Sequence, residues 1–167
     1  LKPLLTLQLG ALGQIRDETL FNNELTTLSN TIFKAKFSNY QKAESDFAQY
    51  TCCADSLGGA GWELNQDVGL YCLNTALCSF GGLKDADGNS ISDKERLMID
   101  TRSLNQWLAG ASSKTKILVM HHPLEWLAEW ANSELGKIIA TEFHLVFSGH
   151  VHQQDVVFSS RGNGPSI

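Results

Sequence analysis

The sequence predicts an α/β domain, because apolar residues recur with helical spacing in some segments and form short runs in others. In the segment 18–50 they follow one another at steps of three and four residues, which is typical of amphipathic helices. The runs 117–120 and 145–148 are apolar, short and bounded by polar residues, which is typical of buried strands. With 167 residues, 43% hydrophobic and 19% charged, the chain is long enough for a single domain over 1–167.

The first half of the chain predicts a hairpin between helices. The segment 52–61 is rich in glycine and is expected to be a loop. Strands are expected over 62–64 and 68–74, joined by a turn at 65–67. A short helix is expected over 103–109, where Leu104, Trp107 and Leu108 share one face.

The second half predicts a strand, a helix and another strand. After the strand 117–120, Pro123 precedes apolar residues with helical spacing from Leu124 to Ile139, with a break expected at Asn132-Ser133. The strand 145–148 follows. This order is that of a βαβ unit, so the two strands are expected to be parallel neighbours or near-neighbours in one sheet.

Charge and cysteine content exclude several classes of partner. The formal charge is −5 and no Lys/Arg cluster stands out, so neither nucleic acid nor an anionic membrane surface is indicated as a partner. No apolar run is long enough to span a bilayer. The four cysteines include an adjacent pair, Cys52-Cys53, and match neither a disulfide framework nor a zinc knuckle, which predicts reduced thiols and a cytoplasmic location.

The segment 81–93 has the composition of an exposed turn, with aspartate, asparagine and glycine close together. A calcium-binding loop beginning at Asp85 is the alternative. Such a loop needs a glutamate at its twelfth position, where this chain has Arg96, so the turn is favoured.

Four of the five histidines follow the two buried strands. His121 and His122 follow the first strand, and His150 and His152 follow the second. The carboxyl ends of parallel strands meet at one edge of a sheet, and imidazole is a common ligand of zinc, manganese and iron. A metal site is therefore predicted there, with His150 and His152 on the same side if the backbone stays extended.

The remaining histidine and the tryptophans are assigned no chemistry. His144 is expected to be an ordinary polar residue with a hydrogen-bond partner. The four tryptophans are expected to pack in or around the core.

The sequences Met120-His121-His122-Pro123 and Ser148-Gly149-His150-Val151-His152 resemble the C-terminal metal motifs of the calcineurin-like metallophosphoesterases. The resemblance covers residues 62–158 and implies a β-sandwich flanked by helices around two divalent cations (Mn, Fe or Zn). It implies that His121 and His150 bind one cation and that His152 binds the other. His122 would contact the substrate phosphate or orient a ligand, and an ordinary buried hydrogen bond is an equal alternative.

The implied activity is phosphoester hydrolysis by a water that the two cations activate, on a phosphorylated small molecule or nucleotide. One alternative is a catalytically inactive binding or regulatory module on the same scaffold. A third reading is a structural zinc site made by His121, His150 and His152.

The other ligand motifs of that family, DxH, GDxx(D/N) and GNH(D/E), are absent, and no histidine precedes His121. Three imidazoles leave each of two cations with fewer protein ligands than a catalytic site keeps. Either an N-terminal portion with these motifs precedes Leu1, so that the domain is incomplete, or the protein is a degenerate relative. The first is favoured, because the HHP and GHxH motifs are both intact.

Overall fold

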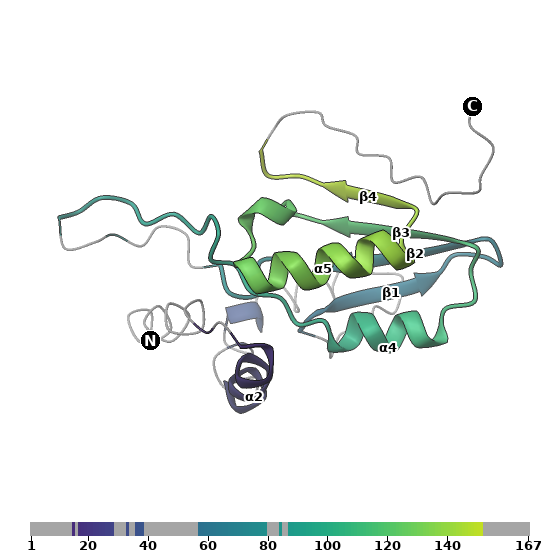
Figure 1. Ribbon diagram of the computed structural model, residues 1–167, viewed down its shortest axis with the longest axis horizontal. Coiled ribbons are helices and arrows are strands. Elements are labelled where there is room, and N and C mark those ends of the chain that lie inside the picture. Colours follow the sequence, from purple (N-terminus) through teal and green to yellow (C-terminus); the bar gives the residue numbers. More distant parts are fainter. Residues whose placement is uncertain are drawn as a thin grey trace.

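The computed structural model describes residues 15, 17–28, 33, 36–38, 57–79, 84 and 87–151. In these ranges four strands form one mixed sheet in the order β1-β2-β3-β4, flanked by helices (Figure 1). The strands are β1 (Gly59–Glu63), β2 (Val68–Leu73), β3 (Thr115–Met120) and β4 (Leu145–Ser148). β1 is antiparallel to β2, whereas β2, β3 and β4 are mutually parallel. The predicted α/β class, hairpin and parallel βαβ unit are confirmed.

The helices are α2 (Glu18–Leu28), α4 (Arg102–Gly110), the 3-10 helix η2 (Leu124–Trp126) and α5 (Glu129–Glu142). α4 and α5 lie side by side over one face of the sheet (Figure 1). Between them, the rings of Trp107 and Phe143 stack with centroids 6.2 Å apart. The buried core of this layer consists of apolar residues from β2, β3, α4, α5 and the segments next to the two helices: Tyr71, Leu73, Leu97, Ile99, Leu104, Leu118, Met120, Leu127, Ala131, Leu135 and Phe143.

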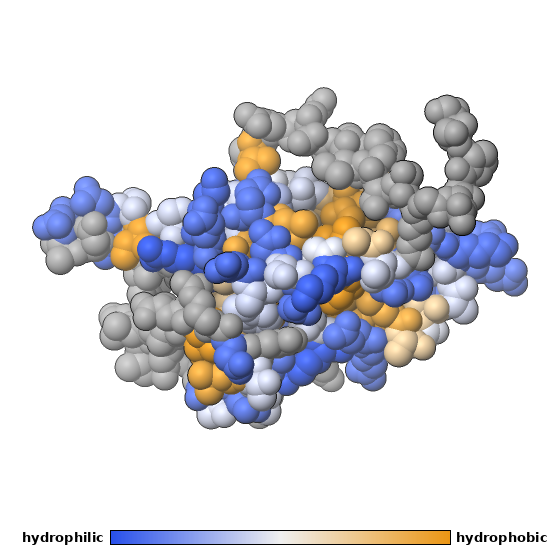
Figure 2. Space-filling model, viewed as in Figure 1, coloured by the Kyte–Doolittle hydropathy of each residue, from blue (hydrophilic) through white to orange (hydrophobic). Residues whose placement is uncertain are grey.

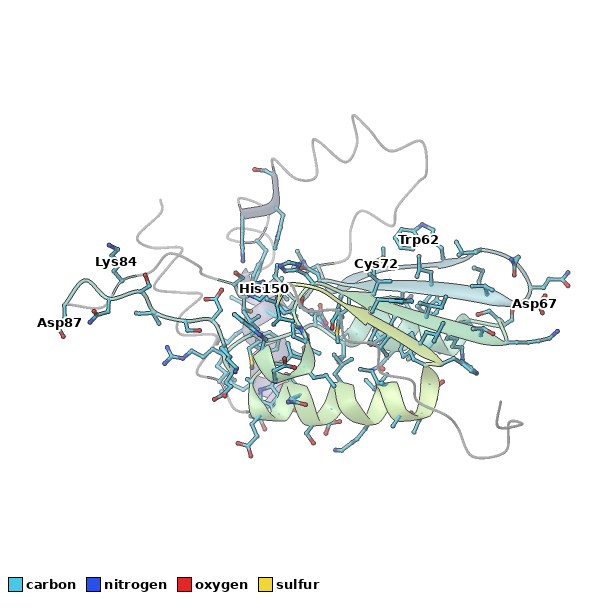
Figure 3. The ribbon with its side chains drawn as sticks, turned by 90° about the horizontal axis from the view of Figure 1, so that it is seen from above. Trp62, Asp67, Cys72, Lys84, Asp87 and His150 are labelled. Carbon is cyan, nitrogen blue, oxygen red and sulfur yellow. The ribbon has the colours of Figure 1, made fainter. Side chains whose placement is uncertain are left out.

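The two faces of the sheet differ in their cover. Tyr71 and Leu73 are buried under the helices, so the alternation of a strand turns Cys72 to the opposite face. Figure 3 shows Cys72 and Trp62 on the side of the sheet away from α5. Val68, Leu70 and Cys72 share this second face of β2 and are half-buried, so the face is apolar and partly open along this strand.

A second apolar cluster lies beside the sheet, where α2 packs. Phe21 and Leu25 of α2 are fully buried there, together with Leu77 and Met98. Trp130 contacts both clusters and lies 5.7 Å from the ring of Phe21. The helix predicted at the start of the segment 18–50 is therefore confirmed for α2; residues 39–50 lie outside the described ranges.

The predicted loop at 52–61 is wrong at its end, because β1 begins at Gly59. A side chain at Gly61 would place its Cβ 2.5 Å from Cδ1 of Trp107. β1 approaches the indole of Trp107 so closely that only glycine fits at position 61. This glycine is therefore required by close packing and does not indicate a loop. Cys52 and Cys53 lie outside the described residues.

The predicted helix break at Asn132-Ser133 is also wrong. Asn132 N donates to Ala128 O at 2.9 Å and α5 continues through it. The break lies at Leu127 and Ala128, because Ala128 N donates to Leu97 O at 2.8 Å while Leu97 N donates to Trp126 O. This pairing with a remote segment holds the chain extended between η2 and α5.

In the described part of the chain, no helix combines the length and the hydropathy needed to cross a membrane. Hydrophilic and hydrophobic residues are mixed over the surface that α4 and α5 present (Figure 2). Phe147 and Val151, in and just after β4, are among the exposed large apolar residues. The predicted turn at 81–93 is described only in part; Lys84 and Ser90 pair across it as an isolated antiparallel bridge.

Candidate metal centre

The candidate site lies where β3 and β4 end. His121 and His122 directly follow β3, and His150 comes two residues after the last residue of β4. Met120 and Ser148 are partners in the parallel register, so the two strands end side by side. Gly149 N donates to His121 O at 3.0 Å, which extends the pairing by one step into the site.

The imidazoles of His121 and His150 face each other. Nδ1 of His150 lies 3.0 Å from Nε2 of His121, and the rings are nearly perpendicular with centroids 4.9 Å apart. Two nitrogens that bind one tetrahedral zinc ion at about 2.0–2.1 Å are themselves about 3.3 Å apart. These two ring nitrogens are therefore within a few tenths of an ångström of the spacing that suits a shared cation.

His122 belongs to the same group. The ligand nitrogens of His121, His122 and His150 all lie within 4.8 Å of one another. The structure thus brings together two of the three predicted metal ligands and the predicted substrate-binding residue. His152 lies outside the described residues, so its predicted role as a ligand stays a prediction.

The backbone at the second motif is not extended, which corrects the geometry assumed from the sequence. His150 has φ of 70° and Val151 N donates to Gly149 O at 2.9 Å, so the chain turns at this point. A left-handed backbone is uncommon outside glycine and costs free energy, so it persists where the surroundings enforce it. Here the turned residue is the one whose imidazole faces His121.

Thr75 holds His122 in place from the turn that follows β2. His122 N donates to Thr75 Oγ1 at 2.9 Å, and the same oxygen lies 3.0 Å from His122 Nδ1. Both residues are buried, with His122 4% exposed and Thr75 1% exposed. Burial, together with His121 and His150, lowers the pKa of His122 to about 4, while Asp93 acts in the opposite direction. His122 is therefore neutral at pH 7.

Trp126 forms one wall of the site. Its ring centroid is 4.0 Å from that of His150, edge to face, and 5.7 Å from that of His122. The sequence analysis assigned Trp126 only to packing. Its position, four residues after His122 on the βα connection, was the available signal, because such connections border ligand sites in parallel sheets.

A buried polar cluster adjoins the site around the turn that follows β2. Asp93 is 8% exposed; Ser79 Oγ donates to its Oδ2 at 2.8 Å, and its Oδ1 has no hydrogen-bond partner in the described ranges. Lys36 Nζ donates to three carbonyl oxygens of this turn, those of Ala76, Leu77 and Ser79, at 2.7–2.8 Å.

Burial lowers the pKa of Lys36 to about 8, and the neighbouring Cys78 and Asp93 oppose that shift. Burial also raises the pKa of Cys78 to about 12. Sequence reasoning missed Thr75, Asp93 and Lys36. For Thr75 a signal existed, since it follows β2 at the same edge of the sheet as the histidines.

His144 behaves as expected from the sequence. Its Nδ1 accepts a hydrogen bond from Lys116 N at 3.2 Å, at the start of β4 and at the opposite end of the strand from the site.

A comparison with known protein families, curated proteins and solved structures finds no match to this chain. Three imidazoles offer nitrogen ligands suited to zinc, manganese or iron. No carboxylate joins this group in the described part of the chain.

Proposed function

We propose that the chain is a metal-dependent hydrolase that cleaves phosphoester bonds with a metal-activated water. The observation that supports this most is the meeting of His121, His122 and His150 at two parallel strand ends, within the sequences HHP and GHVH. When bound there, divalent cations would polarise the phosphoryl oxygens and lower the pKa of a water.

The proposal includes two divalent cations (Mn, Fe or Zn). His121 and His150 would bind the first through Nε2 and Nδ1, the two nitrogens 3.0 Å apart. His152 would bind the second. The further donors that a second cation requires are not in the histidine group of the described residues.

We also propose the sandwich architecture that the sequence motifs imply. The described residues contain one sheet, and the apolar face that includes Trp62 and Cys72 is the face on which a second sheet would pack (Figure 3). The substrate would be a phosphorylated small molecule or a nucleotide. A reducing, cytoplasmic location agrees with Cys72 and Cys78 being free thiols.

The test is hydrolysis of p-nitrophenyl phosphate and bis-p-nitrophenyl phosphate by the 167-residue chain with Mn²⁺. We expect turnover that EDTA abolishes and Mn²⁺ restores. The His144→Ala variant is the matched control, because this imidazole lies outside the histidine group and should leave turnover unchanged. Absence of turnover with manganese, iron and zinc alike would refute hydrolysis by this chain.

A non-catalytic binding or regulatory module is the second candidate. It is favoured by the absence of the DxH, GDxx(D/N) and GNH(D/E) sequences and by the lack of a carboxylate in the described histidine group. Tight binding of one cation without turnover is the result that would select it.

A further inference from the structure

We infer that the turn that follows β2 is a binding site for a large monovalent cation such as K⁺, and that the ammonium group of Lys36 fills this site as a tethered cation. We infer further that the filled site positions Thr75 for its contact with His122. The cation site does not depend on the proposed hydrolysis, because none of its atoms belongs to the histidine group.

Three carbonyl oxygens of this turn converge on one point. Those of Ala76, Leu77 and Ser79 each lie 2.7–2.8 Å from Nζ of Lys36. A lysine ammonium group has three hydrogens and no acceptor, so all three of its hydrogens are donated here. Carbonyl oxygens that converge in this way also replace the hydration shell of K⁺ in proteins. The same three oxygens can therefore coordinate a metal cation at the position of Nζ.

The donor set selects a large ion of single charge. Ca²⁺ takes oxygen ligands at about 2.3–2.6 Å and Mg²⁺ at about 2.0–2.1 Å, and both ions are usually bound through carboxylates. The three oxygens here are neutral and lie at 2.7–2.8 Å from their common centre. A monovalent cation of about the size of an ammonium group therefore suits them better than a divalent one.

Two neighbouring groups favour a positive charge at the same point. Lys36 Nζ lies over the ring of Phe37, 5.2 Å from its centroid, which is within the range of a cation–π contact. The buried carboxylate of Asp93 favours the charged form of Lys36. Ser79 connects the two charged residues, because its carbonyl oxygen accepts from Lys36 and its hydroxyl donates to Asp93. Removal of the ammonium group would leave three carbonyl oxygens and a buried carboxylate without their positive neighbour, which costs stability.

The same turn reaches the candidate metal centre through Thr75. Thr75 Oγ1 accepts a hydrogen bond from His122 N at 2.9 Å, and both residues are buried. Ala76, which gives one of the three carbonyl oxygens, is the next residue in the chain. A cation that holds this carbonyl therefore also restrains the backbone of Thr75. Lys36 is thus a positioning residue for the loop that carries His121 and His122.

The direct test compares Lys36→Ala with Lys36→Met in thermal unfolding, in potassium chloride and in choline chloride at equal ionic strength. Both variants lose the ammonium group, so we expect both to lower Tm by about 5 °C or more in choline chloride. Lys36→Ala leaves room for an ion, and K⁺ should restore about half of its loss or more. The methionine side chain fills that room, so Lys36→Met should not respond to K⁺. Lys114→Ala, at an exposed lysine, should keep the wild-type Tm in both salts.

A Tm of Lys36→Ala that is equal in potassium and choline chloride would overturn the cation site. n-Propylammonium replaces the missing end of the lysine side chain and should restore Lys36→Ala as K⁺ does. Restoration by n-propylammonium alone would also overturn the site, because it would show that the three carbonyl oxygens require N–H donors.

Two NMR spectra complete the test. In the wild-type chain, below the pKa of Lys36, the ¹H–¹⁵N spectrum of the lysine ammonium groups should contain a slowly exchanging signal that Lys36→Met lacks. Its absence would overturn the inference even if Lys36→Ala does not fold. The backbone amide signal of His122 should shift in Lys36→Ala and return with K⁺, and an unchanged signal would contradict the positioning of Thr75. If the wild-type chain shows no hydrolysis, the proposed function fails while these results still decide the cation site.

Discussion

The two ends of the sheet differ in how far the hydrogen bonds of their polar groups are satisfied. At the end where β2 and β3 begin, Asn65 Oδ1 accepts hydrogen bonds from Asp67 N and Val68 N, and both carboxylate oxygens of Glu63 accept from Ser113. At the end where β3 and β4 finish, Asp93 Oδ1 has no partner among the described residues, and the ring nitrogens of His121 and His150 face each other at 3.0 Å.

Polar groups with partners stabilise a fold, whereas unpaired buried ones cost stability and are retained where they serve something else. A concentration of imidazoles beside a buried carboxylate oxygen without a hydrogen-bond partner in the described residues is therefore typical of a binding site. The opposite end needs no ligand to complete its hydrogen bonds.

The largest effect is expected from removing either facing imidazole. His121→Ala and His150→Ala each remove one of the two nitrogens that suit a shared cation, and we expect Co²⁺ affinity to fall by at least about 100-fold. Isothermal titration with Co²⁺ measures it. His144→Ala, at the opposite end of β4, is the control and should bind like the wild type; equal losses in all three variants would contradict the assignment.

Gly59, near the site, should tolerate substitution less than Gly110, at the other end of the sheet. Gly59 pairs with Leu73 and has φ of +140°, and a Cβ there would lie 2.2 Å from Cys72 O. We expect Gly59→Ala to lower the free energy of unfolding by about 2 kcal/mol or more. Gly110, at the end of α4, has open space around its Cα, so Gly110→Ala should be neutral or stabilising by up to about 1 kcal/mol. Urea unfolding of the two variants measures both, and similar losses would refute the contrast.

Regular elements with local signals were predictable from the sequence, and elements that depend on remote contacts were not. The apolar runs of β3 and β4 and the spacing of Leu104 and Trp107 in α4 define those elements locally. β1 was misjudged because its glycines respond to Trp107, which lies far along the chain. The extended link between η2 and α5 depends on Leu97 in the same way.

The same division holds for the site. The meeting of His121 and His150 followed from strand order alone, because parallel neighbours end at the same edge. Thr75 had the same signal, because it follows β2 at that edge. Asp93 and Lys36 come from other segments, and only tertiary packing brings them to the turn that follows β2. Their residue types are common and have no spacing that marks them in a sequence.

Stability should respond to pH through Lys36, beside the site. Its pKa is about 8 in the folded chain against an ordinary value of 10.5, so between these values the unfolded chain binds more protons and the free energy of unfolding rises with pH. Cys78 acts oppositely, but only above its ordinary pKa of 9.0, since its pKa is about 12 when folded.

From pH 8 to pH 9 the effect of Lys36 exceeds the opposing effect of Cys78 and of Cys72, whose pKa is also raised by burial, and a comparison with Lys36→Met separates them. We expect the free energy of unfolding to rise there by up to about 1 kcal/mol, and Lys36→Met to remove the rise. Urea unfolding at closely spaced pH values measures the slope. A flat or falling wild-type profile across this window would show that burial does not dominate the pKa of Lys36.

The smallest effect is expected at the opposite end of the sheet. Lys114 and Asp67 form an ion pair at 2.8 Å, and both side chains are largely exposed. Lys114→Ala should therefore change the free energy of unfolding by less than about 0.5 kcal/mol and leave Co²⁺ affinity unchanged. A change in Co²⁺ affinity would show that the two ends of the sheet are coupled.

The most direct measurement is anomalous X-ray diffraction at the zinc absorption edge from crystals of the chain grown with Zn²⁺. The account predicts an anomalous peak between Nε2 of His121 and Nδ1 of His150, with the hydrogen bond between these two rings replaced by bonds to the ion. A structure in which the two rings remain hydrogen-bonded to each other, and zinc binds elsewhere or not at all, would contradict it.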